Sequence, residues 1–374
     1  MKRILISLVA WFLSLSSEAS PTLAFVKSQV IDNPHGNDVV LADFGGRGKV
    51  DAVIASGSAD QPLVSRLWSN DGTGTFHASG QALGCAKSWS VACGRLRPGG
   101  ANDVFLASGD WRQGATSQLW INDGRGRFTG SAVDFGRANS SAAALGDLNG
   151  DGLADLFLAN HPYADGHGGE CEVWMNDGQG RLVDSGQRLE TWRAPRRIKL
   201  ADVDGDGALD AVVLFADGPN VILLNDGKGR FTKGRIEIGQ GDNLDLAVGD
   251  LDADGKPDVV IAKGAWGTKP AGVEIWHNEG AGRFGLQMRL GNRDVYGVAL
   301  GDLTGDHALD LVAVCGPGQA NQTFVNDRNG HLVEAIADLG SGGNKVAIAD
   351  LNHDGLLDLL IVGDESAAVW LQHR

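Results

Sequence analysis

The segment Asp202-Val-Asp204-Gly-Asp206-Gly-Ala-Leu-Asp210 places an acid at its first, third, fifth and ninth positions. Four further segments keep this spacing with small changes, and they begin at Asp147, Asp250, Asp302 and Asp350. Two weaker copies occupy residues 43–51 and 95–103. The seven copies therefore start at residues 43, 95, 147, 202, 250, 302 and 350, which lie 48 to 55 residues apart. Self-similarity at such a period indicates a repeat protein with one structural unit per period.

A second motif keeps step with the acidic one. Asn70-Asp-Gly-Thr-Gly-Thr-Phe76 recurs with changes as Asn122…Phe128, Asn176…Leu182, Asn225…Phe231, Asn278…Phe284 and Asn326…Leu332. Asn-Asp-Gly between apolar runs predicts a hairpin turn. Each repeat then divides into four strands, which in the third repeat are expected at 142–146, 155–159, 171–175 and 181–189. A repeated four-stranded unit of this length is typical of a propeller blade.

The two ends of the chain are expected to share a blade. The chain stops after Val369-Trp-Leu371, a third strand that no fourth strand follows. A strand at Phe25–Val30 precedes Asp43 by the interval that separates Phe231 from Asp250, within one residue. We therefore predict an all-β fold, a seven-bladed β-propeller of four-stranded antiparallel blades whose N-terminal strand closes the last blade. The alternative, an open solenoid, would not need this strand and would leave sheet edges exposed.

The N-terminus predicts export from the cytoplasm. Lys2 and Arg3 precede an apolar run over residues 4–15, and small residues follow at Ser17 and Ala19. This pattern is typical of a secretory signal peptide, which we assign to residues 1–19, leaving residues 20–374 as a single propeller. A membrane anchor is the alternative, but the run is shorter than the roughly 20 residues that span a bilayer. We expect a secreted protein, extracellular or periplasmic, without a membrane span.

Net charge limits the kinds of partner that the protein can have, and the cysteine content limits its possible disulfides. The formal net charge of -15 argues against nucleic acid or an anionic membrane as the main partner. Export permits disulfides, and the four cysteines, Cys85, Cys93, Cys171 and Cys315, allow three pairings. Cys85 and Cys93 are closest in sequence and form the preferred pair, while the others fit small buried residues.

The acidic loops are predicted to bind calcium (Ca²⁺). Oxygen ligands at alternate positions, with a glycine at the sixth, suit a hard cation that takes six to eight oxygens. Zinc would prefer nitrogen or sulfur, and magnesium would keep more water. The five loops hold 17 of the 47 acidic residues, and the remaining 30 are balanced by 32 basic residues. Aspartate and glycine also favour turns, but that alternative does not explain five loops with one ligand spacing.

The predicted ligands occupy the first, third, fifth and ninth positions of the five loops: Asp147, Asn149, Asp151, Asp155, Asp202, Asp204, Asp206, Asp210, Asp250, Asp252, Asp254, Asp258, Asp302, Thr304, Asp306, Asp310, Asp350, Asn352, Asp354 and Asp358. The loop at Asp302 is the weakest, because Thr304 is a poorer ligand and His307 replaces the glycine. We expect no ion in the first two loops, where Gly45, Arg47, Arg97 and Gly99 stand at the inner positions. Arg47 is a candidate built-in cation for Asp43 and Asp51.

These motifs resemble the FG-GAP/VCBS repeat family, best known from the β-propeller heads of integrin α subunits. The resemblance covers about residues 23–374 and rests on the acidic loop, its flanking apolar strands and the Asn-Asp-Gly turn. It implies that each loop joins the first two strands of a blade on the lower face and that the five intact loops bind calcium there. It says little about function, because the family includes adhesion proteins, lectins and carriers fused to enzymes.

Aromatic residues mark a candidate ligand face. Five tryptophans share one position of the third strand and are expected to pack between blades: Trp68, Trp120, Trp174, Trp276 and Trp370. The residues expected on the upper face are Trp89, Trp111, Tyr163, Trp192, Trp266 and Tyr296, with Arg112, Arg193, Arg196 and Arg197 nearby. Rings beside arginines suit a sugar or anchor a protein partner. Alternatively, the rings only fill the gap near the axis.

The sequence therefore predicts a secreted, calcium-binding propeller that acts as a non-catalytic binding or adhesion module. Its connections are short and leave little material for a deep catalytic cleft. We expect a monomer whose partner is a glycan or an extracellular protein. One alternative is a carbohydrate-binding lectin. Another is a polysaccharide lyase or hydrolase that uses His161, Tyr163, His167 and Glu170, but no nucleophile elbow or zinc-protease motif is present.

Overall fold

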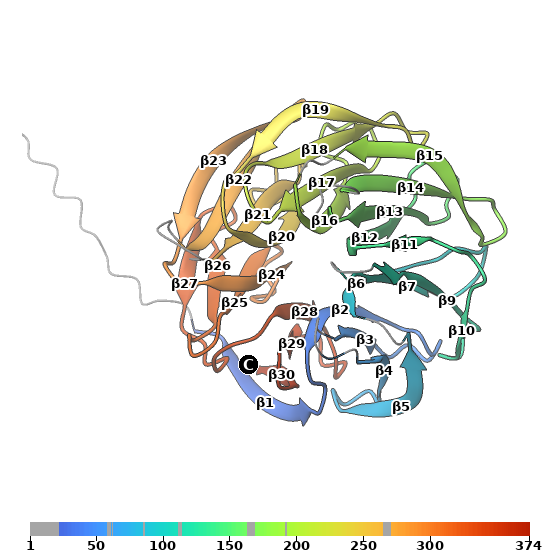
Figure 1. Cartoon of the computed structure of the whole chain (residues 1–374). Helices are drawn as coiled ribbons and strands as arrows, with labels where there is room; N and C mark the ends of the chain where they lie inside the picture. Colours follow the sequence, from blue (N-terminus) through green and yellow to red (C-terminus); the bar gives the residue numbers. More distant parts are fainter. Residues whose placement is uncertain are drawn as a thin grey trace, which may run out of the picture.

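The described residues form seven four-stranded antiparallel sheets arranged as a ring (Figure 1). The computed structural model describes residues 22–57, 61, 63–84, 87–110, 114–162, 169–190, 193–264 and 271–374. In the third blade, β12 (Ser140–Gly146), β13 (Asp155–Asn160), β14 (Glu170–Asn176) and β15 (Leu182–Glu190) follow one another from the centre outward. The seven-bladed propeller is confirmed, and the predicted strands of this blade differ by one or two residues from those observed.

Four other blades repeat this order. Blade one holds β2 (Gly36–Ala42), β3 (Asp51–Ser56), β4 (Ser65–Asn70) and β5 (Phe76–Leu83). Blade four holds β16 (Pro195–Ala201), β17 (Asp210–Phe215), β18 (Asn220–Asn225) and β19 (Phe231–Ile238). Blade five holds β20 (Asn243–Gly249), β21 (Asp258–Lys263), β22 (Gly272–Gly280) and β23 (Arg283–Leu290). Blade six holds β24 (Val295–Gly301), β25 (Asp310–Cys315), β26 (Gln322–Asn326) and β27 (Leu332–Ala335).

Blade two departs from the pattern. Its sheet consists of β6 (Ser88–Gly94), β7 (Asp103–Ser108), β9 (Gln118–Asn122) and β10 (Phe128–Gly130), so the outer strand is short. The chain beside it forms a separate two-stranded sheet from β8 (Ala115–Thr116) and β11 (Arg137–Ala138). The repeat pattern did not predict this small sheet, because its residues belong to neither motif.

The N-terminal strand closes the ring. Blade seven consists of β28 (Lys345–Ala349), β29 (Asp358–Val362), β30 (Ala367–His373) and, on the outside, β1 (Ala24–Ile31). The two strands are antiparallel, and Val26 lies opposite Leu371. Both ends of the described chain therefore sit in one sheet, as Figure 1 shows, and the predicted closure is confirmed.

The hydrophobic core lies between neighbouring blades. Each sheet packs its faces on the sheets beside it, because one four-stranded unit cannot bury both faces alone. Phe105 and Leu119 of blade two share a cluster with Leu158 and Trp174 of blade three, for example. The five third-strand tryptophans all belong to such clusters, which confirms their packing role: Trp68, Trp120, Trp174, Trp276 and Trp370.

Several predictions concern the remaining parts of the chain. The proposed signal peptide, residues 1–19, lies outside the described residues. Within the described residues, no helix has the length and apolar character needed to cross a membrane. Cys93, Cys171 and Cys315 are free cysteines. The preferred partner of Cys93, Cys85, lies outside the described residues, so that pairing stays a prediction. Cys171 and Cys315 are buried as expected.

Candidate functional site

The first aspartate of each acidic loop shapes the turn. In blade four, the Asp202 carboxylate accepts hydrogen bonds from the backbone N–H groups of Gly205 at 2.8 Å, Asp206 at 3.1 Å and Gly207 at 2.9 Å. The turn also needs a left-handed residue at its sixth position, where Gly207 has a φ of 91°. Only glycine adopts this conformation without strain. His307 occupies this position in blade six with a φ of 72°, as the sequence predicted.

The ninth aspartate joins the loop to the third strand. The buried Asp210 carboxylate accepts hydrogen bonds from Val203 N at 3.1 Å and from Asn225 N at 2.8 Å. Burial raises the pKa of Asp210 to about 6 in spite of these hydrogen bonds, and it raises the pKa of Asp155 in blade three to about 6 as well. Each of these buried carboxylates would gain from a nearby positive charge.

The asparagine of the turn motif connects neighbouring blades. The Asn225 side chain donates to the carbonyl oxygen of Leu148, which belongs to the loop of the preceding blade, at 2.8 Å. The same contact recurs around the ring from Asn70, Asn122, Asn176, Asn278 and Asn326. In blade seven, Gln372 replaces the asparagine and donates to Leu303 O at 2.7 Å. Sequence reasoning assigned these asparagines to turns only, although their constant step with the acidic loops was the available signal.

The inner acids converge in two loops. In blade four, carboxylate oxygens of Asp202, Asp204 and Asp206 lie within 4.8 Å of one another, and Asp250, Asp252 and Asp254 do the same in blade five. Burial and the neighbouring Asp206 charge raise the pKa of Asp204. In the loops at Asp147 and Asp350, the third-position amide instead contacts the fifth-position acid, with Asn149 Nδ2 3.1 Å from Asp151 Oδ2 and Asn352 Nδ2 3.0 Å from Asp354 Oδ2.

The donor set of blades four and five fits a hard divalent cation. Several carboxylate oxygens face one small volume, and such oxygens are the ligands that calcium prefers. Basic side chains contact the fifth-position acids of two loops: Lys256 contacts Asp254 in blade five, and Arg328 Nε lies 2.9 Å from Asp306 Oδ2 in blade six. These contacts show that the loops attract positive charge.

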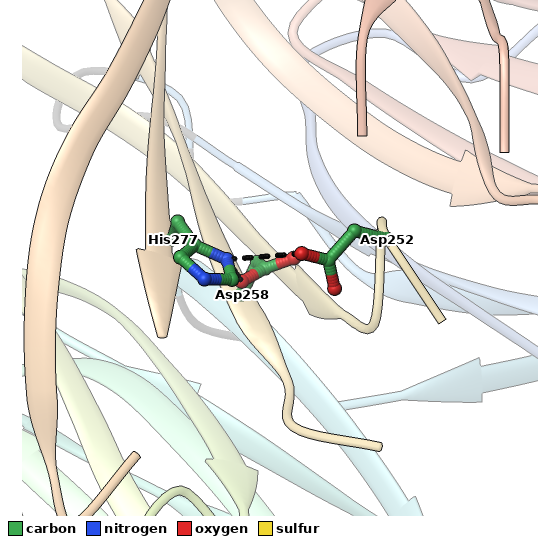
Figure 2. A group of neighbouring side chains, drawn as sticks. All are labelled: Asp252, Asp258 and His277. Carbon is green, nitrogen blue, oxygen red and sulfur yellow. Dashed lines mark hydrogen bonds and ion pairs between the residues drawn. The ribbon is translucent and has the colours of Figure 1, made fainter. Parts of the chain in front are cut away.

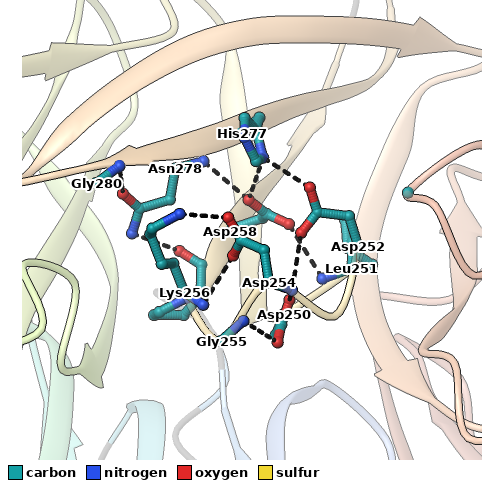
Figure 3. A network of polar contacts seen from close by, with 12 residues as sticks. Asp250, Leu251, Asp252, Asp254, Gly255, Lys256, Asp258, His277, Asn278 and Gly280 are labelled. Atoms are coloured by element: carbon teal, nitrogen blue, oxygen red, sulfur yellow. Dashed lines mark hydrogen bonds and ion pairs between the residues drawn. The ribbon is translucent and has the colours of Figure 1, made fainter.

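Blade five also brings a histidine to its acids (Figure 2). His277 Nδ1 lies 3.1 Å from Asp258 Oδ1 and 3.4 Å from Asp252 Oδ2, so the three residues form one cluster. Figure 3 shows the same cluster within the wider network, where Asp250 accepts from Gly255 N and Asp258 accepts from Asn278 N. Sequence reasoning missed His277, because it lies on the third strand. At its position the other repeats have Ser69, Ile121, Met175, Leu224, Val325 and Leu371.

The first two loops carry their own cations. Arg47 Nη2 lies 2.7 Å from Asp51 Oδ1, so Arg47 provides the built-in positive charge that the sequence suggested for Asp51. Asp43 instead accepts a hydrogen bond from the backbone N–H of Arg47 at 3.0 Å. Arg97 plays the same part in blade two, with Nη2 3.0 Å from Asp103 Oδ1, although it stands at a different loop position.

A cavity of about 540 Å³ opens at the opposite end of the innermost strands. Every blade contributes to its lining, and seven of the lining residues, one per blade, stand six positions before their acidic loops: Asn37, Trp89, Ser141, Arg196, Leu244, Tyr296 and Asn344. We call these residues the mouth ring. Six residues of strand separate the ring from the loops by about 20 Å. Of the six predicted ligand-face residues, Trp89 and Tyr296 line this cavity, whereas Trp111, Tyr163, Trp192 and Trp266 lie outside the described residues.

Comparison with known proteins places this architecture in a family. The model of the FG-GAP-like repeat matches residues 100–158, 147–213, 202–261, 250–313 and 302–361, each spanning two successive acidic loops or their remnants. The chain belongs to the FG-GAP-like repeat family. This FG-GAP-like propeller is also 25% identical over 306 residues to cartilage acidic protein 1 of Xenopus tropicalis. The match covers 73% of the chain but only 43% of that protein, so the chain spans less than half of the relative's length.

Solved structures agree with the fold. Two crystal structures of BBS1N in complex with ARL6DN, one soaked with lead and one with mercury, superpose with TM-scores of 0.63 and 0.64. Each match covers 94% of this chain and 97% of the other, at 11% sequence identity, and it shows a shared fold alone. The FG-GAP-like repeats and the relative from cartilage fit an extracellular protein.

Two of the four catalytic candidates of this FG-GAP-like propeller, His161 and Glu170, lie within the described residues. His161 lines the mouth cavity and has its Nδ1 2.8 Å from Pro162 O, while Glu170 pairs with Arg188 at 3.7 Å. Tyr163 and His167 lie outside the described residues. FG-GAP-like propellers are typically non-catalytic, and binding is the role that this family suggests.

Proposed function

We propose that this protein is a secreted, calcium-stabilised β-propeller that binds a glycan or an extracellular protein without catalysis. The observation that carries the calcium part is the convergence of three carboxylates in the loops at Asp202 and Asp250. Membership of the FG-GAP-like repeat family supports the binding role. The mouth cavity, with its two aromatic rings and two arginines, is the candidate partner surface.

The chain's own residues prepare each loop for the ion. The first aspartate closes the turn by accepting backbone hydrogen bonds, and the third and fifth side chains then point their oxygens at one volume. The buried ninth aspartate ties this volume to the third strand. Bound calcium would supply positive charge that offsets the repulsion among these acids. The loops at Asp202 and Asp250 should bind most tightly, because they hold four carboxylates each.

Thermal unfolding of the mature protein tests the calcium part. Binding to the native state alone adds RT ln(1 + [L]/Kd) per site, about 2.7 kcal/mol at a hundredfold excess over Kd. We therefore expect the melting temperature to rise with calcium, to rise less with magnesium and to fall with chelator. A melting temperature that is the same in calcium and in chelator would reject calcium stabilisation. Sequencing the N-terminus of exported protein tests secretion, with Ser20 expected near the start.

A binding screen tests the partner role. Calcium-loaded protein is applied to arrays of glycans and extracellular proteins, beside a Trp89→Leu variant. Leucine occupies the equivalent position of blade five as Leu244, so the blade tolerates this change. We expect a partner that the wild type binds and the variant binds more weakly. Equal binding by both proteins would remove the mouth cavity from the partner site.

A further inference from the structure

The mouth cavity differs in charge from the rest of the protein. The whole chain has a formal net charge of -15, yet none of the described residues that line the cavity is acidic. Arg196 and Arg197, adjacent on β16, both line it, and His161 contributes a third basic side chain. A basic cavity in an acidic protein concentrates anions locally, because the surrounding negative surface does not reach into it.

Asp38 and Asp245, the acids that lie deeper in the protein near Arg197, already accept hydrogen bonds from other groups. Below the mouth, a second cavity of about 320 Å³ is lined by Asp38, Arg197 and Lys345 among others. Asp38 accepts hydrogen bonds from Ser90 Oγ at 2.9 Å and from Val91 N at 3.1 Å.

The fully buried Asp245 contacts both Arg197 and Lys345, which line the second cavity. It accepts a hydrogen bond from Lys345 and another from Val298 N at 3.0 Å, and Arg197 Nε lies 3.4 Å from its Oδ1. Burial alone would raise the pKa of Asp245, but Lys345 and Arg197 hold it below its usual range. The Arg197 side chain is thereby anchored at the base of the cavity, with Arg196 next to it.

Arg196 carries the charge that a ligand would meet. Burial and the neighbouring Arg197 charge lower the pKa of the Arg196 guanidinium, an effect that Tyr296 and Asp242 oppose. Two like charges crowded in a partly buried site are relieved by an anion. Guanidinium groups bind carboxylates and sulfates through paired N–H donors, which gives such contacts both strength and orientation.

The Trp89 and Tyr296 rings each pack against a glycine of their own blade. An added Cβ at Gly109 would lie 3.1 Å from the Trp89 ring, and one at Gly316 would lie 3.0 Å from the Tyr296 ring. Both glycines stand six residues after the ninth aspartate of their blades. Trp89 Nε1 also donates to Gly109 O at 3.1 Å. The rings are therefore held in place on blades two and six, with Arg196 between them on blade four, and fixed rings of this kind suit the apolar face of a sugar.

We propose that the mouth cavity binds an acidic sugar, one or two rings that carry a carboxylate or sulfate, with the anion on Arg196 and Arg197 and a sugar face against Trp89 or Tyr296. The inference deepens the proposed binding function and rests on it. The volume of about 540 Å³ falls within the range of about 300–1,000 Å³ that is usual for small-ligand sites.

Calorimetric titration of calcium-loaded full-length mature protein tests the inference. The probes are a saturated digalacturonate, a sulfated galactose disaccharide, a neutral galactose disaccharide and sodium sulfate. We expect at least one acidic disaccharide to bind about tenfold more tightly than the neutral one, because only the former pairs with the arginines. The two acidic probes distinguish carboxylate from sulfate as the preferred anion.

Each test substitution introduces a residue that another blade already has at the equivalent position. We therefore expect the variants to fold, so that a change in binding reports on the site. Arg196→Ser reproduces the residue of blade three, Ser141, and Trp89→Leu reproduces that of blade five, Leu244. Arg196→Ser should abolish the preference for the acidic disaccharide, whereas Trp89→Leu should weaken both disaccharides. The control Arg230→Ser makes the same charge change at an exposed turn, where the arginine pairs only with nearby Asp226, and should bind like the wild type.

Three results would overturn the inference. They are absence of binding by every acidic disaccharide, an unchanged preference in Arg196→Ser, and sodium sulfate binding as tightly as the disaccharides, which would leave no role for the sugar. The screen on glycan and protein arrays distinguishes a wrong acidic-sugar inference from a wrong proposed function. A partner bound equally by wild type and Arg196→Ser would keep the binding role and reject the acidic sugar, whereas no partner at all would reject both.

Discussion

The loops of blade one and blade four have the same backbone but opposite charges at the centre. Asp43 accepts from Arg47 N at 3.0 Å and Gly48 N at 2.7 Å, as Asp202 accepts from its own turn. The fifth position is Arg47 in one loop and Asp206 in the other. The same turn therefore forms with a basic or an acidic side chain at its centre. Under the proposed function, an external cation is needed only where the inner positions are acidic.

The ninth aspartate is common to both loops. Asp51 accepts from Gly45 N and Asn70 N in blade one, and Asp210 accepts from Val203 N and Asn225 N in blade four. This residue therefore connects strands whether or not its loop has the other ligands. Its first role is structural, and ion binding adds to it.

Removing the ninth aspartate should have the largest effect on both loops. Asp51→Ala and Asp210→Ala each leave two backbone N–H groups without their acceptor in a buried place. Unsatisfied buried donors cost about 1–3 kcal/mol each, so we expect the free energy of unfolding to fall by about 2–4 kcal/mol in either variant. Urea denaturation in chelator measures this. A loss below about 1 kcal/mol in either variant would contradict the shared structural role.

Converting one loop into the other should separate the turn from its ion. Asp206→Arg gives blade four the central residue of blade one, and the arginine can contact Asp210 as Arg47 contacts Asp51. The variant should bind one calcium ion fewer by native mass spectrometry. It should lose that site's share of the calcium-dependent stabilisation, about 2.7 kcal/mol at a hundredfold excess over Kd. In chelator its stability should be at least that of the wild type, because the arginine removes one repelling acid and pairs with Asp210. A loss of stability there would show that the arginine cannot replace the ion.

Removing the Arg47 guanidinium from blade one should lower the free energy of unfolding by less than the changes above. This loss should not depend on calcium. Arg47→Met keeps much of the side chain's volume but leaves the buried Asp51 carboxylate without its charged partner. We expect a loss of about 1–2 kcal/mol, below the full cost of a buried unpaired charge because Arg47 is itself partly exposed. Denaturation with and without calcium measures it. A loss confined to the calcium-free sample would contradict the assignment of Arg47 as a permanent cation.

Relieving the strained turn of blade six should have the smallest effect. His307 has a φ of 72°, where the four other intact loops have glycine. His307→Gly should raise the free energy of unfolding by about 0.5–1 kcal/mol, because the strain of a left-handed side chain exceeds the extra freedom of glycine in the unfolded chain. The reverse change in blade five, Gly255→His, is the matched control and should destabilise by a similar amount. Calorimetric melting would detect either shift, and a lower melting temperature for His307→Gly would contradict the argument.

The repeat spacing was sufficient to predict the blades, their number and their closure. One period contains all four strands, and the missing fourth strand at Leu371 had one matching segment at Phe25–Val30. Contacts between repeats could not be predicted in this way. Asn225 reaches Leu148 across a blade boundary, and His277 reaches the acids from another strand, so neither appears as a spacing within a motif. Arg97 was missed because it substitutes for the ion from a different loop position than Arg47.

The closed seventh blade gives the chain an order of assembly. The strand Ala24–Ile31 leaves a ribosome or a translocation pore long before its partner Ala367–His373. Ser28 and Val369, which meet across that pair, lie 341 positions apart in the sequence. Contacts so distant in sequence form slowly. The early strand therefore waits for its partner until Ala367–His373 has been synthesised, and the ring can close only then.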